Sequence, residues 1–369
     1  MPNLWIGHKN QFDSLKTAVE NNRAAHAYLL WGARGIGKNA FAVQAARAYL
    51  CENETFGICG ECNSCLKTKK QAHPDLKILL PVKHQSGEVD QTDIKKQLNH
   101  LLTKPHLPTE SSVNLNIGIE EVRKLRKEAS LSPYESPMRI ILILDMEKFS
   151  AGAANALLKL LEEPPATVRF IMTTNSFDGV LPTIRSRCQS LRFQGHSDES
   201  MRYLLNLYFP DYGAEETESL LQLAEGNFHD AVSFMGDNIE EEQEYVVEFL
   251  RNAHSGTPIT INEAIRKLFG GKDKDQIRRF MKMLLQWFRD LLVLKNGKEG
   301  KQNIVFSKQK ETMINYGQYY DKLDISEAVR IIEENALYFE QKVYVPLVIT
   351  RMAIQLNRLL KNSSSKTTT

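Results

Sequence analysis

Residues 26–39 read HAYLLWGARGIGKN, a short apolar run that leads into a glycine-rich loop. The run has the length of a strand, and the alanine-rich segment 39–50 predicts a helix. The loop matches G-x-x-x-x-G-K, in which backbone N–H groups surround a phosphate and the lysine adds a positive charge. A glycine turn without nucleotide is the alternative, but a strand before and a helix after the loop favour phosphate binding. The candidate ligands are Gly32, Gly35, Gly37, Lys38 and Asn39.

The last position of this loop departs from the pattern. Asn39 stands where a serine or threonine hydroxyl ordinarily binds Mg²⁺, and its amide oxygen is an imperfect substitute. Hydrolysis also needs an acidic pair at the end of a nearby strand, one residue for Mg²⁺ and one to activate water. The apolar run 139–144 is followed by Asp145-Met146-Glu147, which contains no adjacent acidic pair. Asp145 is the candidate magnesium ligand, and Met146 then occupies the place of the activating glutamate.

The remaining pattern predicts a parallel α/β P-loop domain followed by all-α domains. Strands are predicted at 26–31, 139–144, 168–174 and 191–193. Helices are predicted at 39–50, 117–130, 151–163, 199–208, 214–224, 228–236, 276–295, 326–339 and 346–360. Ser326 is the expected N-cap of its helix, and the apolar stripe of 276–295 is expected to be bundle core. Residues 83–116 are expected to form a polar, irregular insertion.

Four of the five cysteines, Cys51, Cys59, Cys62 and Cys65, lie close together in the sequence. The two-residue spacings allow the thiolates to surround one tetrahedral ion, and four thiolates with no open position are typical of structural zinc. The alternatives are four free thiols and a redox C-x-x-C, which no thioredoxin-like surroundings support. The lysine-rich run at 67–70 is interpreted as a solvated face and not as a DNA contact.

Bulk properties exclude several classes of protein. The 369 residues include 47 Lys+Arg and 45 Asp+Glu, and the resulting net charge of +2 cannot by itself hold nucleic acid or an anionic membrane. No apolar run approaches the roughly 18–20 residues of a membrane span. The start MPNLWIGHKNQF lacks the apolar core of a signal peptide. The expected location is therefore the cytoplasm, with no membrane partner.

Four motifs occur in the order found in bacterial clamp-loader subunits. They are the loop HAYLLWGARGIGK, the four cysteines, ANALLKLLEEPP at 154–165 and LPTIRSRC at 181–188. The chain thus resembles the gamma/tau motor subunits and the delta-prime subunit of DNA polymerase III, which are AAA+ proteins. The likeness is close over about residues 1–240. It implies an AAA+ domain at 1–195 with a zinc module at 51–65, a helical lid at 196–240, and a helical collar at 241–369 with a disordered tail at 361–369.

Three departures distinguish this chain from the motor subunits. The motor loop ends in Lys-Thr, and here Asn39 replaces the threonine. The motor's Asp-Glu pair, aligned through Asn155, leaves Asp145 in the place of the glutamate. The motor's sensor arginine lies in G-x-x-R-D-A, and here His229 replaces it. The resemblance therefore implies a delta-prime-like subunit without ATP hydrolysis of its own, and leaves open whether the degenerate loop binds ATP or ADP.

The S-R-C triplet of the family is retained as Ser186-Arg187-Cys188. In the family this arginine enters the ATP site of a neighbouring subunit, where a planar cation stabilises the transferring phosphate. A surface ion pair is the alternative for Arg187, and Cys188 is interpreted as a small core residue. Thr174 and Asn175 occupy the family's sensor region, where they either contact a γ-phosphate or cap the strand.

The resemblance also implies partners. A delta-prime-like subunit joins gamma/tau and delta in a hetero-pentamer that loads the sliding clamp on primer-template DNA, within the DNA-directed DNA polymerase holoenzyme. Two other functions stay open. An active gamma/tau-like ATPase would hydrolyse ATP, and a zinc-dependent nucleic-acid-binding protein with a relic ATPase fold would bind DNA in a salt-sensitive manner.

Overall fold

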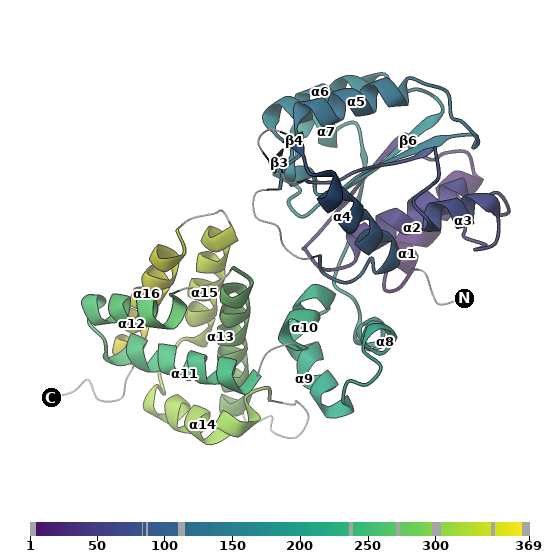
Figure 1. Ribbon diagram of the computed structural model, residues 1–369. Helices are drawn as coiled ribbons and strands as arrows, with labels where there is room; N and C mark the ends of the chain where they lie inside the picture. The colour runs from purple at the N-terminus through teal and green to yellow at the C-terminus, as the bar shows by residue number, and fades with distance from the viewer. Residues whose placement is uncertain are drawn as a thin grey trace. The chain divides into compact units, whose positions relative to one another are not determined.

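The computed structural model describes residues 5–82, 84–85, 88–109, 115–235, 239–270, 274–296, 304–340 and 344–363. The chain divides into two compact units (Figure 1). The first contains Met1–Tyr212 and Glu225–His229, and the second contains Gly213–Ala224 and Asp230–Thr369. The three-part division into AAA+ domain, lid and collar stays a prediction. None of the described helices combines the length and the apolar character that crossing a bilayer requires.

A parallel five-stranded sheet of order β2-β5-β6-β1-β7 forms the centre of the first unit. Its strands are β1 (Ala27–Trp31), β2 (Leu76–Leu79), β5 (Arg139–Ile143), β6 (Val168–Thr174) and β7 (Gln189–Arg192). Every residue of β5 is buried, because helices cover both faces of the sheet. The four predicted strands are confirmed with small shifts of their ends. The short strand β2 was not predicted.

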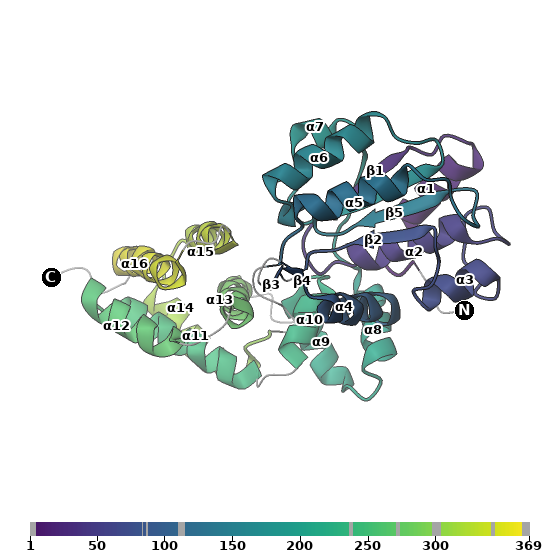
Figure 2. The same cartoon turned by 45° about the horizontal axis from the view of Figure 1, so that its top comes forward.

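Helices cover both faces of this sheet (Figure 2). On one face, α1 (Lys9–Glu20), α2 (Lys38–Leu50) and α4 (Gln91–Thr103) share a core with Leu30 and Leu142. On the other face lie α5 (Ile119–Ala129), α6 (Ala151–Glu162) and the single turn α7 (Pro182–Arg185). The phosphate loop and the ends of the strands that follow it thus stand on a rigid, fully covered sheet.

The expectation of an irregular insertion at 83–116 is wrong. This region contains the two-stranded hairpin of β3 (His84–Gln85) and β4 (Glu88–Val89), followed by the helix α4. Asp90 is the N-cap of α4. Its carboxylate accepts hydrogen bonds from the backbone N–H groups of Thr92 and Asp93 at 2.9 and 3.2 Å. The apolar residues of α4, Ile94, Leu98, Leu101 and Leu102, follow a helical spacing that the polar composition of the region obscured.

Within its described residues the second unit contains helices and connecting segments but no strand. Its helices are α9 (Ala214–Ala224), α11 (Ile239–Ser255), α12 (Pro258–Phe269), α13 (Lys274–Lys295), α14 (Lys310–Tyr319), α15 (Ile325–Glu340) and α16 (Val345–Ser363). Two further helices, α3 (Asn63–Lys69) and α8 (Asp198–Tyr208), belong to the first unit, and α10 (Phe228–Met235) runs from the first unit into the second. Two short 3₁₀ turns lie at Met146–Lys148 and Ser307–Gln309.

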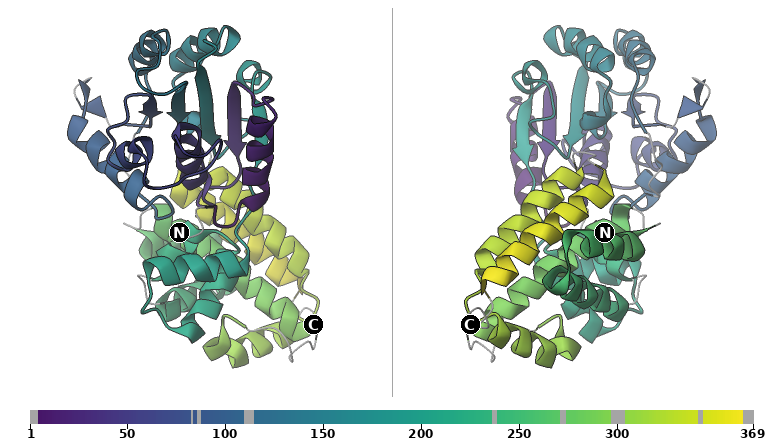
Figure 3. Two further views of the ribbon diagram at one scale, coloured as in Figure 1. Left: turned by 90° about the vertical axis from the view of Figure 1, so that its right-hand side faces the viewer. Right: turned by 90° about the vertical axis from the view of Figure 1, so that its left-hand side faces the viewer.

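The apolar stripe of α13 is core, as predicted. Its buried side chains pack toward α11, α14 and α15, and α15 lies beside α16 (Figure 3). Two expectations are wrong. Asp324, and not Ser326, is the N-cap of α15, because its carboxylate accepts the N–H of Glu327 at 3.0 Å. The tail is not disordered over 361–363, which continue α16, and 364–369 lie outside the described residues.

Candidate functional site

The glycine-rich loop connects β1 to α2, and its glycines meet a steric requirement. Gly35 and Gly37 adopt left-handed backbone angles, with φ of 83° and 86°. A Cβ on Gly35 would lie 2.0 Å from Asn227 Oδ1 and 2.8 Å from the Cβ of His229. Asn227 Nδ2 also donates to the Arg34 carbonyl at 2.8 Å. Residues 225–229 therefore press directly on the loop, and only glycine fits at position 35.

Lys38 is bonded within its own chain. The side chain is 4% exposed, and Nζ donates to the Ala33 carbonyl at 2.6 Å and to Asn175 Oδ1 at 2.8 Å. Burial lowers the pKa of Lys38 to about 8, against the opposing effect of Asp145 and Glu147. The ammonium group thus already uses two of its three donors, and a phosphate would have to compete with these partners.

Asn39 and Asp145 are joined through Thr173. Thr173 Oγ1 donates to Asn39 Oδ1 at 2.7 Å and accepts the N–H of Asp145 at 3.0 Å. Burial raises the pKa of Asp145, and repulsion from Glu147 adds to this effect, while Lys38 and Asn39 oppose it. A carboxyl group that resists ionisation is a weak magnesium ligand, and the amide oxygen of Asn39 already has a donor.

Glu147 is a central residue of the site that was not predicted. It lies in the 3₁₀ turn after Asp145 and accepts hydrogen bonds from Thr174 Oγ1 at 2.8 Å and from the Asn175 N–H at 3.1 Å. Asn175 Nδ2 donates to the second carboxylate oxygen at 2.5 Å. The available signal was an acidic residue two positions after Asp145. Lys38, Asn175 and Glu147 are therefore linked by consecutive hydrogen bonds, which we call the lysine network.

Buried histidines surround the loop. His8 Nε2 lies 2.7 Å from the Ile36 carbonyl, and the rings of His8 and His196 are 4.8 Å apart. Burial lowers the pKa of His229 to about 3, and the positive charges of Arg34 and Lys38 lower it further. His196 has its pKa lowered to about 3, also mainly by burial. His229 is therefore neutral at pH 7 and does not replace the cation that an arginine would supply.

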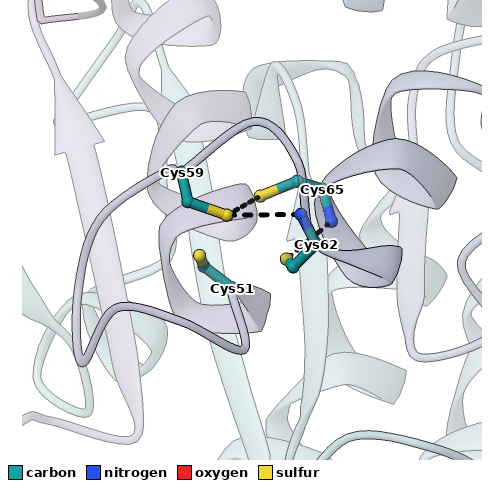
Figure 4. A group of neighbouring side chains, drawn as sticks. All are labelled: Cys51, Cys59, Cys62 and Cys65. Carbon is teal, nitrogen blue, oxygen red and sulfur yellow. Dashed lines mark hydrogen bonds between the residues drawn. The ribbon is translucent and has the colours of Figure 1, made fainter.

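The four clustered thiols converge on one point (Figure 4). All four sulfur atoms lie within 4.8 Å of one another, and those of Cys59 and Cys65 are 3.9 Å apart. This separation matches the edge of about 3.8 Å in a tetrahedron with Zn–S bonds of about 2.3 Å. Backbone N–H groups of Glu61 and Cys62 lower the pKa of Cys59 to about 7, whereas burial raises that of Cys65 to about 12. The four thiols can hold a metal ion, and their geometry is compatible with structural zinc.

A buried polar network ties this cysteine module to the sheet. Ser64 Oγ in α3 donates to Glu52 Oε1 at 2.8 Å and lies 3.0 Å from His73 Nε2. His73 Nδ1 accepts the N–H of Asp75 at 3.1 Å, and Ser136 Oγ lies 3.3 Å from His73 Nε2. None of these residues was predicted. The segment His73-Pro-Asp75 positions the module because it leads directly into β2.

Arg187 lies beyond α7 with its side chain 34% exposed. Nη1 donates to the Thr183 carbonyl at 2.8 Å, and Nη2 contacts Glu162 Oε1 at 2.9 Å. The guanidinium is thus oriented at the surface by the end of α6. Cys188 packs against the core formed with α5 and α6, and burial raises its pKa to about 12.

A family model described as "DNA polymerase III, delta subunit" matches residues 7–197, more than half of the chain. This chain belongs to that family. DNA polymerase III subunit delta' of Pseudomonas aeruginosa is 32% identical over 227 residues, 61% of this chain and 60% of that protein. Subunit delta' of Bacillus subtilis is 27% identical over 291 residues, 78% of each chain. Subunit gamma/tau of Mycobacterium bovis is 27% identical over 315 residues, 79% of this chain and 49% of that protein.

The prediction of a delta-prime-like member of the DNA polymerase III clamp-loader family is confirmed. The chain spans 60% and 49% of the length of the first and third relatives. Within this delta-family chain, the structure brings the predicted residues Lys38, Asn39, Asp145, Thr174 and Asn175 together around the loop. The cysteine cluster and Arg187 lie outside the lysine network, and the roles assigned to all these residues stay predictions.

Lowering the pH below about 6.5 is expected to destabilise the first unit. Burial lowers the pKa values of His106, His196 and His229 to about 4, 3 and 3, below the ordinary histidine value of 6.5. Below pH 6.5 the unfolded state binds more protons, so each histidine costs up to about 1.4 kcal/mol per pH unit until its native pKa is reached. Urea unfolding between neutral pH and pH 5 measures this slope. The variant His229→Gln should show a shallower slope, and an unchanged slope would contradict the prediction.

Proposed function

We propose that this chain is a delta-prime-like subunit of the DNA polymerase III clamp loader that does not hydrolyse ATP. In the cytoplasm it would join gamma/tau and delta subunits, help load the sliding clamp on primed DNA, and supply Arg187 to the ATP site of a neighbouring gamma/tau subunit. The observation that carries the proposal is the lysine network, in which Lys38 is bonded to the Ala33 carbonyl and to Asn175.

The chemistry of hydrolysis supports this choice over an active motor. Phosphoryl transfer depends on a bound Mg²⁺, a group that orients water, and cations around the transferring phosphate. Here Asn39 is bonded to Thr173, Asp145 resists ionisation, and His229 is neutral. The side-chain oxygens of Glu147 already accept hydrogen bonds from Thr174 and Asn175. The residues present do not fit Mg-ATP hydrolysis.

Reconstitution with the gamma/tau, delta and clamp proteins of the same source tests this function. We expect the isolated chain to release no more phosphate from γ-labelled ATP than its Lys38→Ala variant. Adding the chain to the other subunits should be required for ATPase stimulated by primed DNA and clamp. Hydrolysis by the isolated chain that Lys38→Ala abolishes would instead identify a gamma/tau-like motor. Salt-sensitive DNA binding without assembly would identify a zinc-dependent nucleic-acid-binding protein.

We further propose that the cysteine cluster binds one structural zinc ion. Replacing one thiolate, as in Cys62→Ser, should release the metal, because a closed site with four thiolates loses a quarter of its ligands. Zinc content by atomic absorption should fall from about one per chain to near zero, with a lower Tm, since about 1 kcal/mol shifts Tm by about 2–4 °C in a domain of this size. The matched control is Cys188→Ser, which lies outside the cysteine cluster and should leave the zinc content of the chain unchanged. Full zinc content in Cys62→Ser would contradict the proposal.

A further inference from the structure

Two adjacent aromatic rings, flanked by one arginine on each side, lie near the ends of β1, β6 and β7. The guanidinium of Arg192 is 5.3 Å from the centre of the Trp31 ring, and the rings of Trp31 and Phe177 are 4.6 Å apart. The guanidinium of Arg185 is 4.8 Å from the centre of the Phe177 ring. We call these four residues the arginine–aromatic row. Three separate segments contribute to it, so only the folded sheet assembles it.

The row borders a pocket of about 560 Å³. Trp31, Phe177 and Arg192 line it together with the uncharged polar residues Asn175, Ser176 and Gln194 and with Asp178, the carboxylate that pairs with Arg185. Gly32 and Ala33 at the start of the phosphate loop also line it, whereas Lys38, Asn39 and Asp145 do not. The pocket thus adjoins the degenerate nucleotide site and shares Gly32 and Asn175 with it, whereas Trp31, Phe177 and Arg192 lie outside the lysine network.

The charges of the row leave one cation uncompensated. Arg185 pairs with the exposed carboxylate of Asp178 at 2.8 Å. Arg192 is exposed, and among the residues that the structure describes its guanidinium has no ion-pair or hydrogen-bond partner. Contact with the indole of Trp31 holds this guanidinium in place at the edge of the pocket. One oriented cation with five N–H donors suits a single phosphate group.

We propose that this pocket binds one nucleotide unit of a single-stranded nucleic acid, with the base against Trp31 and Phe177 and its phosphate on Arg192. Aromatic faces beside a cation are the usual means of binding single strands, and uncharged polar groups can bond to base edges. A free di- or triphosphate would call for more positive charge than the single uncompensated cation provides. The inference goes beyond the proposed function, because it assigns this chain a direct nucleic-acid contact that requires neither ATP nor Arg187.

The proposal can be tested by measuring how tightly the full chain binds a fluorescein-labelled oligothymidylate. Fluorescence anisotropy at several salt concentrations gives the binding constants. Trp31→Ala should weaken binding by about 5- to 150-fold, the equivalent of about 1–3 kcal/mol for one stacked base, and Trp31→Phe should restore much of it. Arg192→Ala should weaken binding and reduce the slope of log K against log salt by about 0.7. The matched control Arg123→Ala, an exposed arginine on α5 that pairs with Glu120, should bind like the parent.

Competitors separate stacking from charge. A deoxyribose-phosphate polymer without bases should bind the parent about as weakly as oligothymidylate binds Trp31→Ala. No binding at low salt, or equal binding by the parent, Trp31→Ala and Arg192→Ala, would overturn the proposal. Displacement of oligothymidylate by millimolar ATP or thymidine monophosphate would reassign the pocket to free nucleotides. Loss of assembly with the other subunits in Trp31→Ala, with oligothymidylate binding unchanged, would reassign the row to a protein partner. Circular dichroism confirms that each variant is folded.

Discussion

Replacing Arg187 with alanine is expected to abolish hydrolysis at one ATP site of the assembled complex while leaving assembly intact. An arginine supplied in trans contributes about 10³–10⁵-fold to kcat at the site that it enters. The neighbouring site that we propose Arg187 to enter should therefore slow by at least about 10³-fold. Single-turnover hydrolysis by the reconstituted complex with primed DNA and clamp measures this effect. The rapid burst of phosphate release should lose the part of its amplitude that comes from one ATP site.

The surroundings of Arg187 explain why folding should survive. The side chain is 34% exposed, and its polar contacts with the residues that the structure describes are to the Thr183 carbonyl, Ser186 Oγ and Glu162. An exposed ion pair of this kind contributes about 0–1 kcal/mol. Arg187→Lys keeps the charge but loses the planar fork, and should recover only part of the rate. Glu162→Gln removes the surface partner and should leave the rate intact. A burst of full amplitude with Arg187→Ala would exclude the arginine-finger role.

The strands show which parts of this fold a sequence can predict. The segments 139–144 and 168–174 were predictable because a strand buried on both faces is dominated by apolar residues, here at 140–144 and 170–172. β2 was missed because its four residues include Lys77 and are all only partly buried. α4 was missed because the polar residues of 83–116 outnumber the few apolar ones that face the core. These predictions relied on local composition, whereas the burial of each strand or helix depends on segments that are distant in the sequence.

The candidate site shows the same limit. Motifs located Lys38, Asn39 and Asn175, because the phosphate loop and the strand that carries the sensor have recognisable neighbours in the sequence. Glu147 and His73 carry no such signal, since a hydrogen-bond partner can lie at any distance along the chain. His73 contacts residues 64 and 136, which lie on either side of it in sequence and meet only at the edge of the folded sheet. Polar networks of this kind have no periodicity for a pattern to detect.

Asp75 is expected to have the largest effect on stability among the residues of the cysteine module and its supports. Its carboxylate is fully buried and accepts the backbone N–H groups of residues 134, 135 and 136 at 2.7, 2.9 and 3.0 Å. It also lies 3.4 Å from the guanidinium of the buried Arg139. Burial alone would raise the pKa of Asp75, but the three N–H groups and Arg139 together lower it. The carboxylate thus holds the loop before β5 against the start of β2.

Asp75→Ala is expected to lower the free energy of unfolding by about 3–5 kcal/mol, because it leaves the Arg139 charge and three N–H groups buried without their acceptor. Urea unfolding measures the loss, and zinc content, which should not change, separates it from loss of a metal. Asp178→Ala, which removes a carboxylate that is 95% exposed, is the matched control and should cost less than about 1 kcal/mol.

Because the native pKa of Asp75 is lowered, the contribution of Asp75 to stability is complete above pH 3.8 and decreases as the pH falls below that value. Asp75→Asn should lack this component of the acid dependence, and a cost below about 1 kcal/mol for Asp75→Ala would show that the loop and β2 hold together without the carboxylate.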